Sequence, residues 1–303
     1  MKSFKSIQWI ALAALATAAL AAQDPFMIRR AFTVGATDTY KVESEVKQII
    51  EIPSMGEQDM IMTRIATIAV KTLAVNAEKG TADVETLTKV EKSAMDGSIA
   101  AMMGSQDSKL PDPKTEKGTI DSRNRFTVAK DPKESKPAEQ GGPGSMMSMM
   151  AGMGAVSAQQ MLTLVELPEK AVKIGDEFAA VLPAAAGNAP SQGVKDMKMS
   201  IKLVGEKEVD GVKLWVVSYN GSFKLDIDPS KQPKKANEQA SPADDVKVTG
   251  TGIIGGEGLV EQSTGKTISN LFTVKNDLKV YVAQLGSELP VRGTVSTKLT
   301  LVK

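Results

Sequence analysis

Apolar and polar residues alternate over long stretches of this chain, and the alternation is clearest in its second half. Three sets of apolar residues each keep one phase: Met197, Met199, Ile201 and Leu203; Trp215, Val217, Tyr219, Phe223, Leu225 and Ile227; and Val291, Val295, Leu299 and Leu301. A period of two places successive side chains on opposite faces of a strand. Strands with one apolar and one polar face are typical of antiparallel sheets, so we expect a mainly β protein.

Turn signals divide the alternating stretches into hairpins. Asp210-Gly211 lies between two alternating runs and predicts a tight two-residue turn. Asn220-Gly221 lies within a run whose phase continues, which favours a bulge over a second turn. In the first half, Ile61–Val75 and Ala82–Val90 are rich in β-forming residues and flank a turn signal at Asn76–Gly80. These two segments predict a hairpin with a longer loop.

Several shorter segments complete the predicted set of elements. Gly118–Val128 predicts another strand, and Ser98–Met103 predicts a short helix or a loop. The glycine-rich stretch Val246–Val260 predicts a pair of strands with bends at its glycines. Ile268–Val274 and Leu278–Leu285 predict two further strands. In the last strand Gly293 falls in the phase of the apolar residues, where a curved sheet tolerates a glycine.

The segment Leu167–Pro183 has a looser copy near Val34–Tyr40, which suggests a duplicated β module. Together these patterns predict a curved antiparallel sheet or half-barrel with one or two short helices, and a β-sandwich is the alternative. We expect a signal peptide at 1–22, a first β module at 23–130, a Pro/Gly/Met-rich linker with a short helix at 131–160, and a second β module at 161–303. The two modules are expected to share one continuous sheet.

The first residues have the organisation of a secretory signal peptide. Lys2 and Lys5 provide positive charge, Trp9–Leu20 is uncharged and rich in Ala and Leu, and Ala19–Ala21 provides an A-x-A cleavage site. The apolar run is shorter than the roughly 20 residues that a membrane span needs. We therefore expect cleavage after Ala21 or Ala22 and a periplasmic or extracellular protein, with no transmembrane span in the mature chain.

Composition argues against several classes of function. The chain contains no cysteine and no histidine, so it lacks disulfides, the commonest general base and the commonest zinc ligand. Removing residues 1–22, which carry two lysines and no acid, leaves 35 basic and 36 acidic residues. This balance gives no general attraction for nucleic acid. We expect a protein that is not an enzyme and that needs no cofactor or metal.

Three motifs suggest chemistry, but each has a simpler structural interpretation. Gly250–Gly255 matches G-x-G-x-x-G, but more β pattern follows it where a dinucleotide site needs a helix, so we expect a bent strand. In Gly175-Asp176 we expect a turn in which the carboxylate accepts from nearby backbone amides. Asp226 and Asp228 lack a full set of calcium ligands around them.

The segment Ser145–Gly154 is dominated by methionine, which leaves three interpretations open. Its methionines are Met146, Met147, Met149, Met150 and Met153. Thioether sulfurs suit Cu(I), although no Cys or His accompanies them. The alternatives are a flexible segment that covers an apolar groove, and an adaptable apolar binding surface.

One segment of the chain resembles a motif of bacterial envelope proteins of unknown function. Its matching residues are Pro168, Ala171-Val172, Ile174-Gly175-Asp176 and Phe178. In those proteins a Pro-x-x-x-Val-x-x-Gly-Asp-x-aromatic segment begins the second half of an all-β domain. The family is similar to the open half-barrels of periplasmic lipoprotein carriers, in which a curved sheet holds acyl chains beneath helices. This chain has Phe178 where tryptophan is usual. The resemblance implies a carrier-like fold and supplies no catalytic residues.

Two functions of different classes remain from the sequence. The first is an exported, non-enzymatic module that binds an apolar, lipid-like ligand on the curved sheet, with the Met-rich segment as a lid. Its expected lining residues are Met149, Met150, Met153, Trp215, Tyr219 and Phe223. The second is a structural or assembly protein of the cell envelope that binds another protein.

Overall fold

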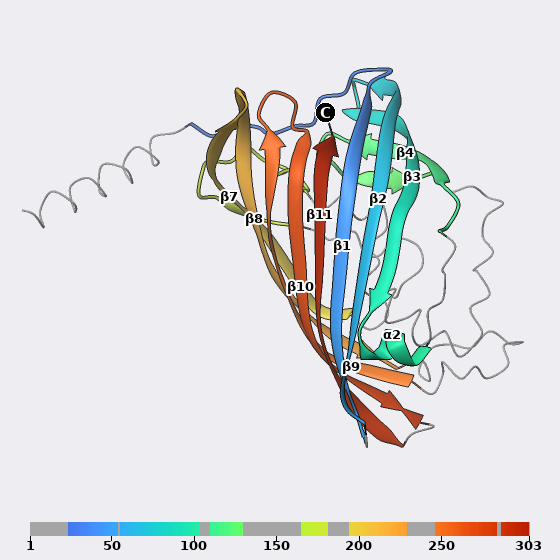
Figure 1. The fold of residues 1–303 in the computed structure, drawn as a ribbon. Helices are drawn as coiled ribbons and strands as arrows, with labels where there is room; N and C mark the ends of the chain where they lie inside the picture. Colours follow the sequence, from blue (N-terminus) through green and yellow to red (C-terminus); the bar gives the residue numbers. More distant parts are fainter. Residues whose placement is uncertain are drawn as a thin grey trace, which may run out of the picture.

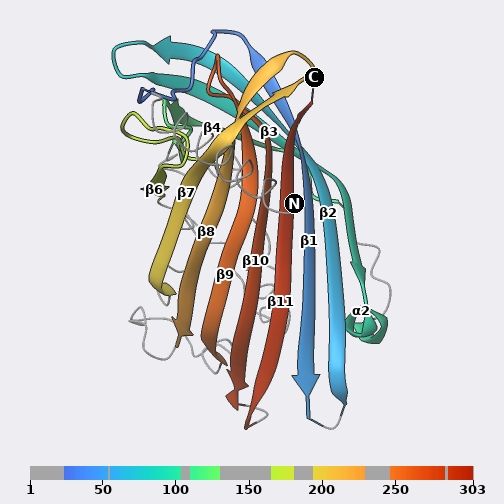
Figure 2. The ribbon, with the colours of Figure 1, turned by 90° about the vertical axis from the view of Figure 1, so that its left-hand side faces the viewer.

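The computed structural model describes residues 24–53, 55–103, 110–129, 165–180, 194–228, 246–283 and 286–302. The described residues form one antiparallel sheet of eleven strands and a six-residue helix, α2 (Ser98–Met103). The sheet is curved and does not close, because its edges are the short strands β5 (Phe126–Val128) and β6 (Glu177–Ala179) (Figures 1 and 2). This confirms the predicted curved sheet, and no sandwich forms in the described residues. Within them, no helix has the length and apolar character to cross a bilayer.

The strands follow two meanders that meet in the middle of the sheet. The first meander contains β1 (Thr37–Ile52), β2 (Gly56–Asn76), β3 (Thr81–Asp96), β4 (Lys114–Asp121) and β5. The second contains β6, β7 (Val194–Val209), β8 (Val212–Ile227), β9 (Val246–Glu261), β10 (Thr267–Val282) and β11 (Ser287–Val302). β1 pairs with β11 from Thr39↔Val302 to Ile50↔Val291. We call the end of the sheet near the C-terminus the upper end and the end near α2 the lower end (Figure 1).

The hairpin turns follow the predicted turn residues. β2 and β3 flank residues 77–80, and β7 and β8 are joined at Asp210-Gly211. Both residues of the second turn have positive φ, 52° for Asp210 and 77° for Gly211. Positive φ at both central residues is typical of the type I′ turn, whose twist matches that of the two strands it joins. The predicted short helix at Ser98–Met103 is also confirmed, as α2.

Three local predictions in the second half are wrong. Val246–Val260 forms one strand, β9, and not a pair, and the two strands expected within 268–285 form the single strand β10. Asn220-Gly221 causes no bulge, because β8 pairs with β9 without interruption there. Irregularities of the register lie instead in β7, between Lys195 and Lys198 and between Leu203 and Gly205, and at the start of β10, between Thr267 and Ser269. β8, β9 and β10 are each paired on both sides, whereas β7 has a neighbour on its outer side at three positions in the described part of the chain.

Two turns of the fold have an equivalent pattern of backbone hydrogen bonds. Before β1, the Gly35 amide donates to the Thr72 carbonyl, and the Thr72 amide donates to the Ala36 carbonyl. Before β6, the Gly175 amide donates to the Leu203 carbonyl, and the Leu203 amide donates to the Asp176 carbonyl. Both glycines have positive φ, which glycine adopts at least cost. The two sequence copies thus start their meanders alike, while the proposed domain boundaries stay a prediction.

One face of the sheet carries the buried side chains, and we call it the inner face. Its apolar residues form two clusters. The upper cluster contains Tyr40, Val42, Ile68, Ile201, Leu203, Trp215, Val217, Tyr219, Phe272 and Leu299, among others. The lower cluster contains Ile50, Met60, Ile99, Ile227, Val246, Val248, Leu278, Val280, Val282, Leu289 and Val291.

The upper cluster has a second layer formed by two segments from outside the sheet. Phe26 and Ile28 come from the segment before β1, and Val165, Leu167 and Val172 come from the segment before β6. Phe26 and Val172 form an isolated β-bridge between the two segments. The Arg29 guanidinium reinforces this contact by donating to the backbone carbonyls of Pro168 and Glu169. The Pro168–Phe178 motif therefore helps to join the two meanders at the upper end.

Candidate functional site

The predicted aromatic lining residues lie together on the inner face of β8. Trp215 and Tyr219 are buried and Phe223 is half-buried, and all three pack in or against the upper cluster. The ring of Phe26 stacks on Trp215 with centroids 4.2 Å apart. Tyr219 meets Phe272 edge-on at 6.4 Å. The predicted lining residues Met149, Met150 and Met153 lie outside the described residues.

Glycines of β9 make room for these rings. A Cβ atom on Gly252 would lie 2.2 Å from Cζ of Phe223, and one on Gly258 would lie 2.5 Å from the hydroxyl of Tyr219. Both distances are far below a normal contact of about 3.5–4.0 Å. The aromatic rings thus fill the space that the missing side chains leave. At the upper end, Trp215, Tyr219 and Phe223 act as packed core residues.

The inner face also carries polar side chains that are not among the predicted lining residues. Gln48 is 2% exposed, Asn270 is 1% exposed, and Asn276 is half-buried. The Gln48 Oε1, both amide atoms of Asn270, the Asn276 Oδ1 and the Tyr219 hydroxyl are buried without a hydrogen-bond partner. Buried polar groups are normally paired, so unpaired ones on an apolar face need an explanation. Their sequence signal is a polar residue in the apolar phase of a strand.

Tyr219 and Asn270 form one part of this polar set. Asn270 is the cross-strand partner of Gly258, over which the Tyr219 hydroxyl lies. Burial raises the pKa of Tyr219 well above its ordinary value, so the phenol stays neutral. A neutral phenol and an amide offer donors and acceptors but no charge.

Gln48 and Asn276 form the other part, lower on the sheet. Both are cross-strand partners of Gly293 in β11, Gln48 from β1 and Asn276 from β10. A Cβ atom on Gly293 would lie 2.6 Å from the Asn276 Oδ1 and 3.3 Å from the Gln48 Cγ. Both amide side chains therefore lean over the glycine from opposite sides. This arrangement lies between the upper and lower clusters.

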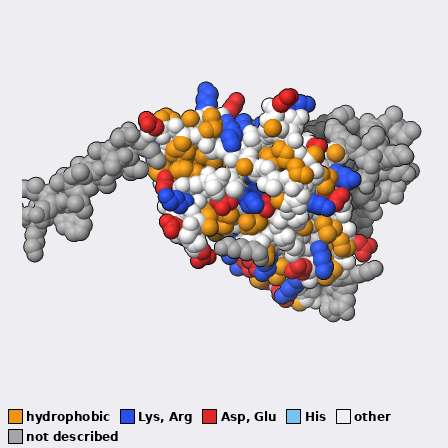
Figure 3. Space-filling model, turned by 90° about the horizontal axis from the view of Figure 1, so that it is seen from above, with side chains coloured by type: hydrophobic (Ala, Val, Ile, Leu, Met, Phe, Trp, Pro, Cys, Tyr) orange, Lys and Arg blue, Asp and Glu red, His pale blue; other side chains and the backbone are white. Residues whose placement is uncertain are grey.

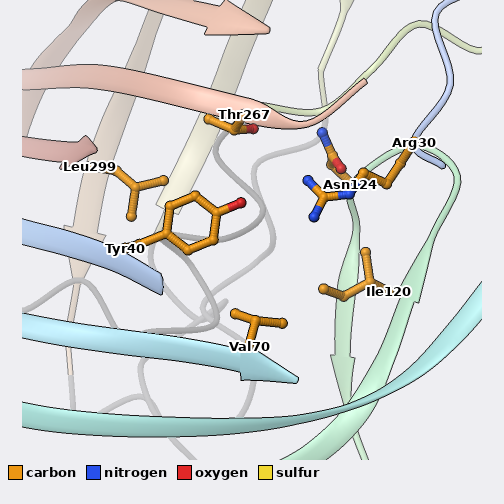
Figure 4. A pocket seen from close by; sticks show the side chains of 7 residues that line it. All are labelled: Arg30, Tyr40, Val70, Ile120, Asn124, Thr267 and Leu299. Carbon is orange, nitrogen blue, oxygen red and sulfur yellow. The ribbon is translucent and has the colours of Figure 1, made fainter. Parts of the chain in front are cut away.

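A charged cluster lies at the upper end, next to a small cavity whose lining residues, Arg30 among them, are shown in Figure 4. Asp38 accepts from Arg30 at 2.6 Å and from Lys266 at 2.5 Å. Arg30 also lines the cavity, together with Tyr40 and Asn124, and burial raises the pKa of Tyr40. The cavity measures about 10 Å³, which is room for one water molecule at most. The cluster thus fixes the segment before β1 and leaves no space for a larger ligand.

The described residues offer no evident metal site. They contain no group of three or more Asp, Glu, His or Cys side chains that would hold an ion. Asp226 pairs with Lys195, and Asp228 pairs with Lys247 at 3.3 Å. The five methionines of the Met-rich segment lie outside the described residues, so Cu(I) binding stays a hypothesis. Figure 3 shows acidic, basic and hydrophobic side chains interspersed over the described surface of the upper end.

Comparisons with known proteins give no family for this chain. No protein-family model matches it, and no curated protein matches it. A solved structure titled "Lipid-protein interactions in lipovitellin" is similar over 90% of this chain, with 11% identity and a TM-score of 0.41. This chain spans 26% of that lipovitellin chain. DynF from the dynemicin biosynthesis pathway of Micromonospora chersina is similar over 93% of this chain and 88% of its own, with 8% identity and a TM-score of 0.22. Likenesses this low carry no functional argument, and the resemblance to bacterial envelope proteins stays a prediction.

Proposed function

We propose that this chain is an exported, non-enzymatic protein that binds an apolar, lipid-like molecule on the inner face of its curved sheet. The lower cluster is the observation that carries the proposal. Its residues come from six neighbouring strands, β2, β1, β11, β10, β9 and β8. Among the described residues of the cluster, Ile99 of α2 alone comes from outside the sheet.

The width of this apolar face supports the proposal. Strands are spaced about 4.8 Å apart, so six strands span about 24 Å. A helix with its side chains is about 10–12 Å wide, and α2 has only six residues. An apolar sheet face needs a second layer; the lower-cluster residues are 1–9% exposed, and among the described residues outside the sheet only α2 contributes to that layer. A flexible hydrocarbon chain is a suitable material for that layer.

The absence of ordinary catalytic groups supports a binding role over an enzymatic one. The sequence has no histidine or cysteine, and the buried polar atoms of the strands that lack a hydrogen-bond partner belong to neutral amides and a phenol. Such groups orient a ligand through hydrogen bonds and do not exchange protons near neutral pH. Export rests on the signal-peptide pattern of residues 1–22.

A chain-length series tests the proposal. The full chain is titrated with monoacylglycerols that have acyl chains of 10, 12 and 14 carbons, and affinity is measured by native mass spectrometry. Each buried methylene contributes about 0.8 kcal/mol, which corresponds to an affinity gain of about fourfold per carbon. Mass spectrometry of the protein as purified would also show a co-purifying lipid.

Matched variants distinguish inner-face binding from non-specific adsorption. Val280→Thr places a hydroxyl in the lower cluster and is expected to weaken binding several-fold. Val204→Thr makes the same change at a residue that is 50% exposed, and it should leave binding unchanged. Affinity that does not depend on chain length, or equal effects of the two variants, would refute the proposal. A ligand-free protein that crosslinks in cells to one defined protein would favour the envelope-assembly alternative.

A further inference from the structure

The amide pair of Gln48 and Asn276 has the features of a polar subsite on an otherwise apolar face. The register places the two residues on either side of Gly293, on strands β1 and β10. The Gln48 Oε1 and the Asn276 Oδ1 are both buried and both lack a hydrogen-bond partner. Two acceptor oxygens without donors are unfavourable in the absence of another molecule.

The neighbouring positions on the inner face are apolar on both sides of the pair. One step towards the upper end, Val46, Val295 and Val274 are in register. One step towards the lower end, Ile50, Val291 and Leu278 are in register, and all three belong to the lower cluster. The amides therefore stand where the lower cluster begins, with no charged residue among these six neighbours.

Gly293 creates the space between the two amides. Because it has no side chain, the amides approach each other across β11, and any Cβ atom there would meet the Asn276 Oδ1 at 2.6 Å. Two unpaired acceptor oxygens on side chains that flank the same glycine favour a group with an O–H or N–H donor. They disfavour a carboxylate, because it is anionic and can only accept hydrogen bonds.

We propose that Gln48 and Asn276 bind the uncharged hydroxyl-bearing head group of an amphipathic ligand, whose hydrocarbon chain extends over the lower cluster. The inference rests on the proposed function and specifies its ligand class as a neutral lipid with a hydrogen-bond donor, such as a monoacylglycerol. An ordered water molecule is the competing occupant, since water also pairs with buried polar groups.

Two probes with the same acyl chain isolate the contribution of the donor. Monododecanoylglycerol carries hydroxyl donors, whereas methyl dodecanoate is an ester without any. The full-length protein should bind the first about tenfold more tightly, since a hydrogen bond to an otherwise unpaired buried group contributes about one tenfold step in affinity. In Gln48→Met and in Asn276→Leu this preference should fall towards one, while affinity for methyl dodecanoate is kept.

The control and a second measurement make the outcomes distinct. Asn220→Leu removes an exposed amide and should leave the preference unchanged. Without ligand, Gln48→Met and Asn276→Leu should both melt at a higher temperature than the original protein, because each removes an unpaired buried amide oxygen. Lower melting temperatures, or a preference that survives both variants, would show that the amides bind water only.

Other outcomes separate this inference from the function on which it rests. Tighter binding of dodecanoate than of monododecanoylglycerol at pH 8 would overturn the head-group assignment but leave lipid binding intact. Failure to bind any of the three probes would overturn the proposed function and the subsite with it.

Discussion

Replacing Gly252 by alanine tests the packing of the aromatic rings against β9. The new Cβ would lie 2.2 Å from Cζ, 2.4 Å from Cε1 and 2.8 Å from Cε2 of Phe223. Restoring a normal carbon–carbon distance of about 3.5 Å requires the ring to move by about 1.3 Å. Overpacking of this kind costs about 1–3 kcal/mol. The entropic advantage of alanine over glycine offsets about 0.5–1 kcal/mol of that cost. We therefore expect Gly252→Ala to lower the free energy of unfolding by about 1–2 kcal/mol.

A double-mutant cycle attributes the cost to the ring. In a Phe223→Ala background the obstruction is gone, so adding Gly252→Ala should be neutral or slightly stabilising. Gly255→Ala is the matched control on the same strand, because nothing lies within 4 Å of its Cβ position. It should be neutral or slightly stabilising.

Urea unfolding followed by far-ultraviolet circular dichroism measures all of these variants, with the midpoint and the slope compared across the series. Equal midpoints for Gly252→Ala and Gly255→Ala would contradict the packing. Simple addition of the Gly252→Ala and Phe223→Ala effects would contradict it as well. Either result would mean that Phe223 does not lie over β9 as described.

Two further predictions concern charged groups at opposite ends of the sheet. Asp38→Asn leaves Arg30 and Lys266 facing each other without a carboxylate, so we expect a loss of about 2–3 kcal/mol in the free energy of unfolding, measured by urea titration; no loss would show that the cluster does not fix the upper end. Hydrogen bonds from the Ser98 amide and hydroxyl hold the pKa of Asp59 below its ordinary value of 3.8. The stabilisation that Asp59 gives to α2 should therefore be complete above about pH 4 and be lost as the pH falls through the lowered pKa, which hydrogen exchange of α2 amides would show; Asp59→Asn should remove this pH dependence.

The period-two pattern was sufficient to predict the class of fold. Tyr40, Val42 and Val46 keep one phase through β1, and Leu299 and Val295 keep it through β11, so burial of one face determines the register. Local turn signals do not predict chain reversal correctly where the sheet is paired on both sides. Gly252 and Gly258 of β9 accommodate rings of β8 and do not reverse the chain, which only the cross-strand register reveals.

The candidate site was only partly predictable. Trp215, Tyr219 and Phe223 pack in or against the upper cluster, and their role in lining a ligand surface stays a prediction. Gln48 and Asn276 were overlooked because they are far apart in sequence and become neighbours only across Gly293. A polar residue in an apolar phase was the available signal, and it gains meaning only when the strand order is known.

The pairing of β1 with β11 has a consequence for how the protein is made. Thr39 pairs with Val302, so the contact joins the earliest long strand to the last one. During synthesis, the edge of β1 that pairs with β11 has no partner until β11 emerges. Contacts between such distant parts of a chain slow folding. The incomplete sheet should therefore depend on chaperones in that interval, and its centre is completed after the flanks on either side.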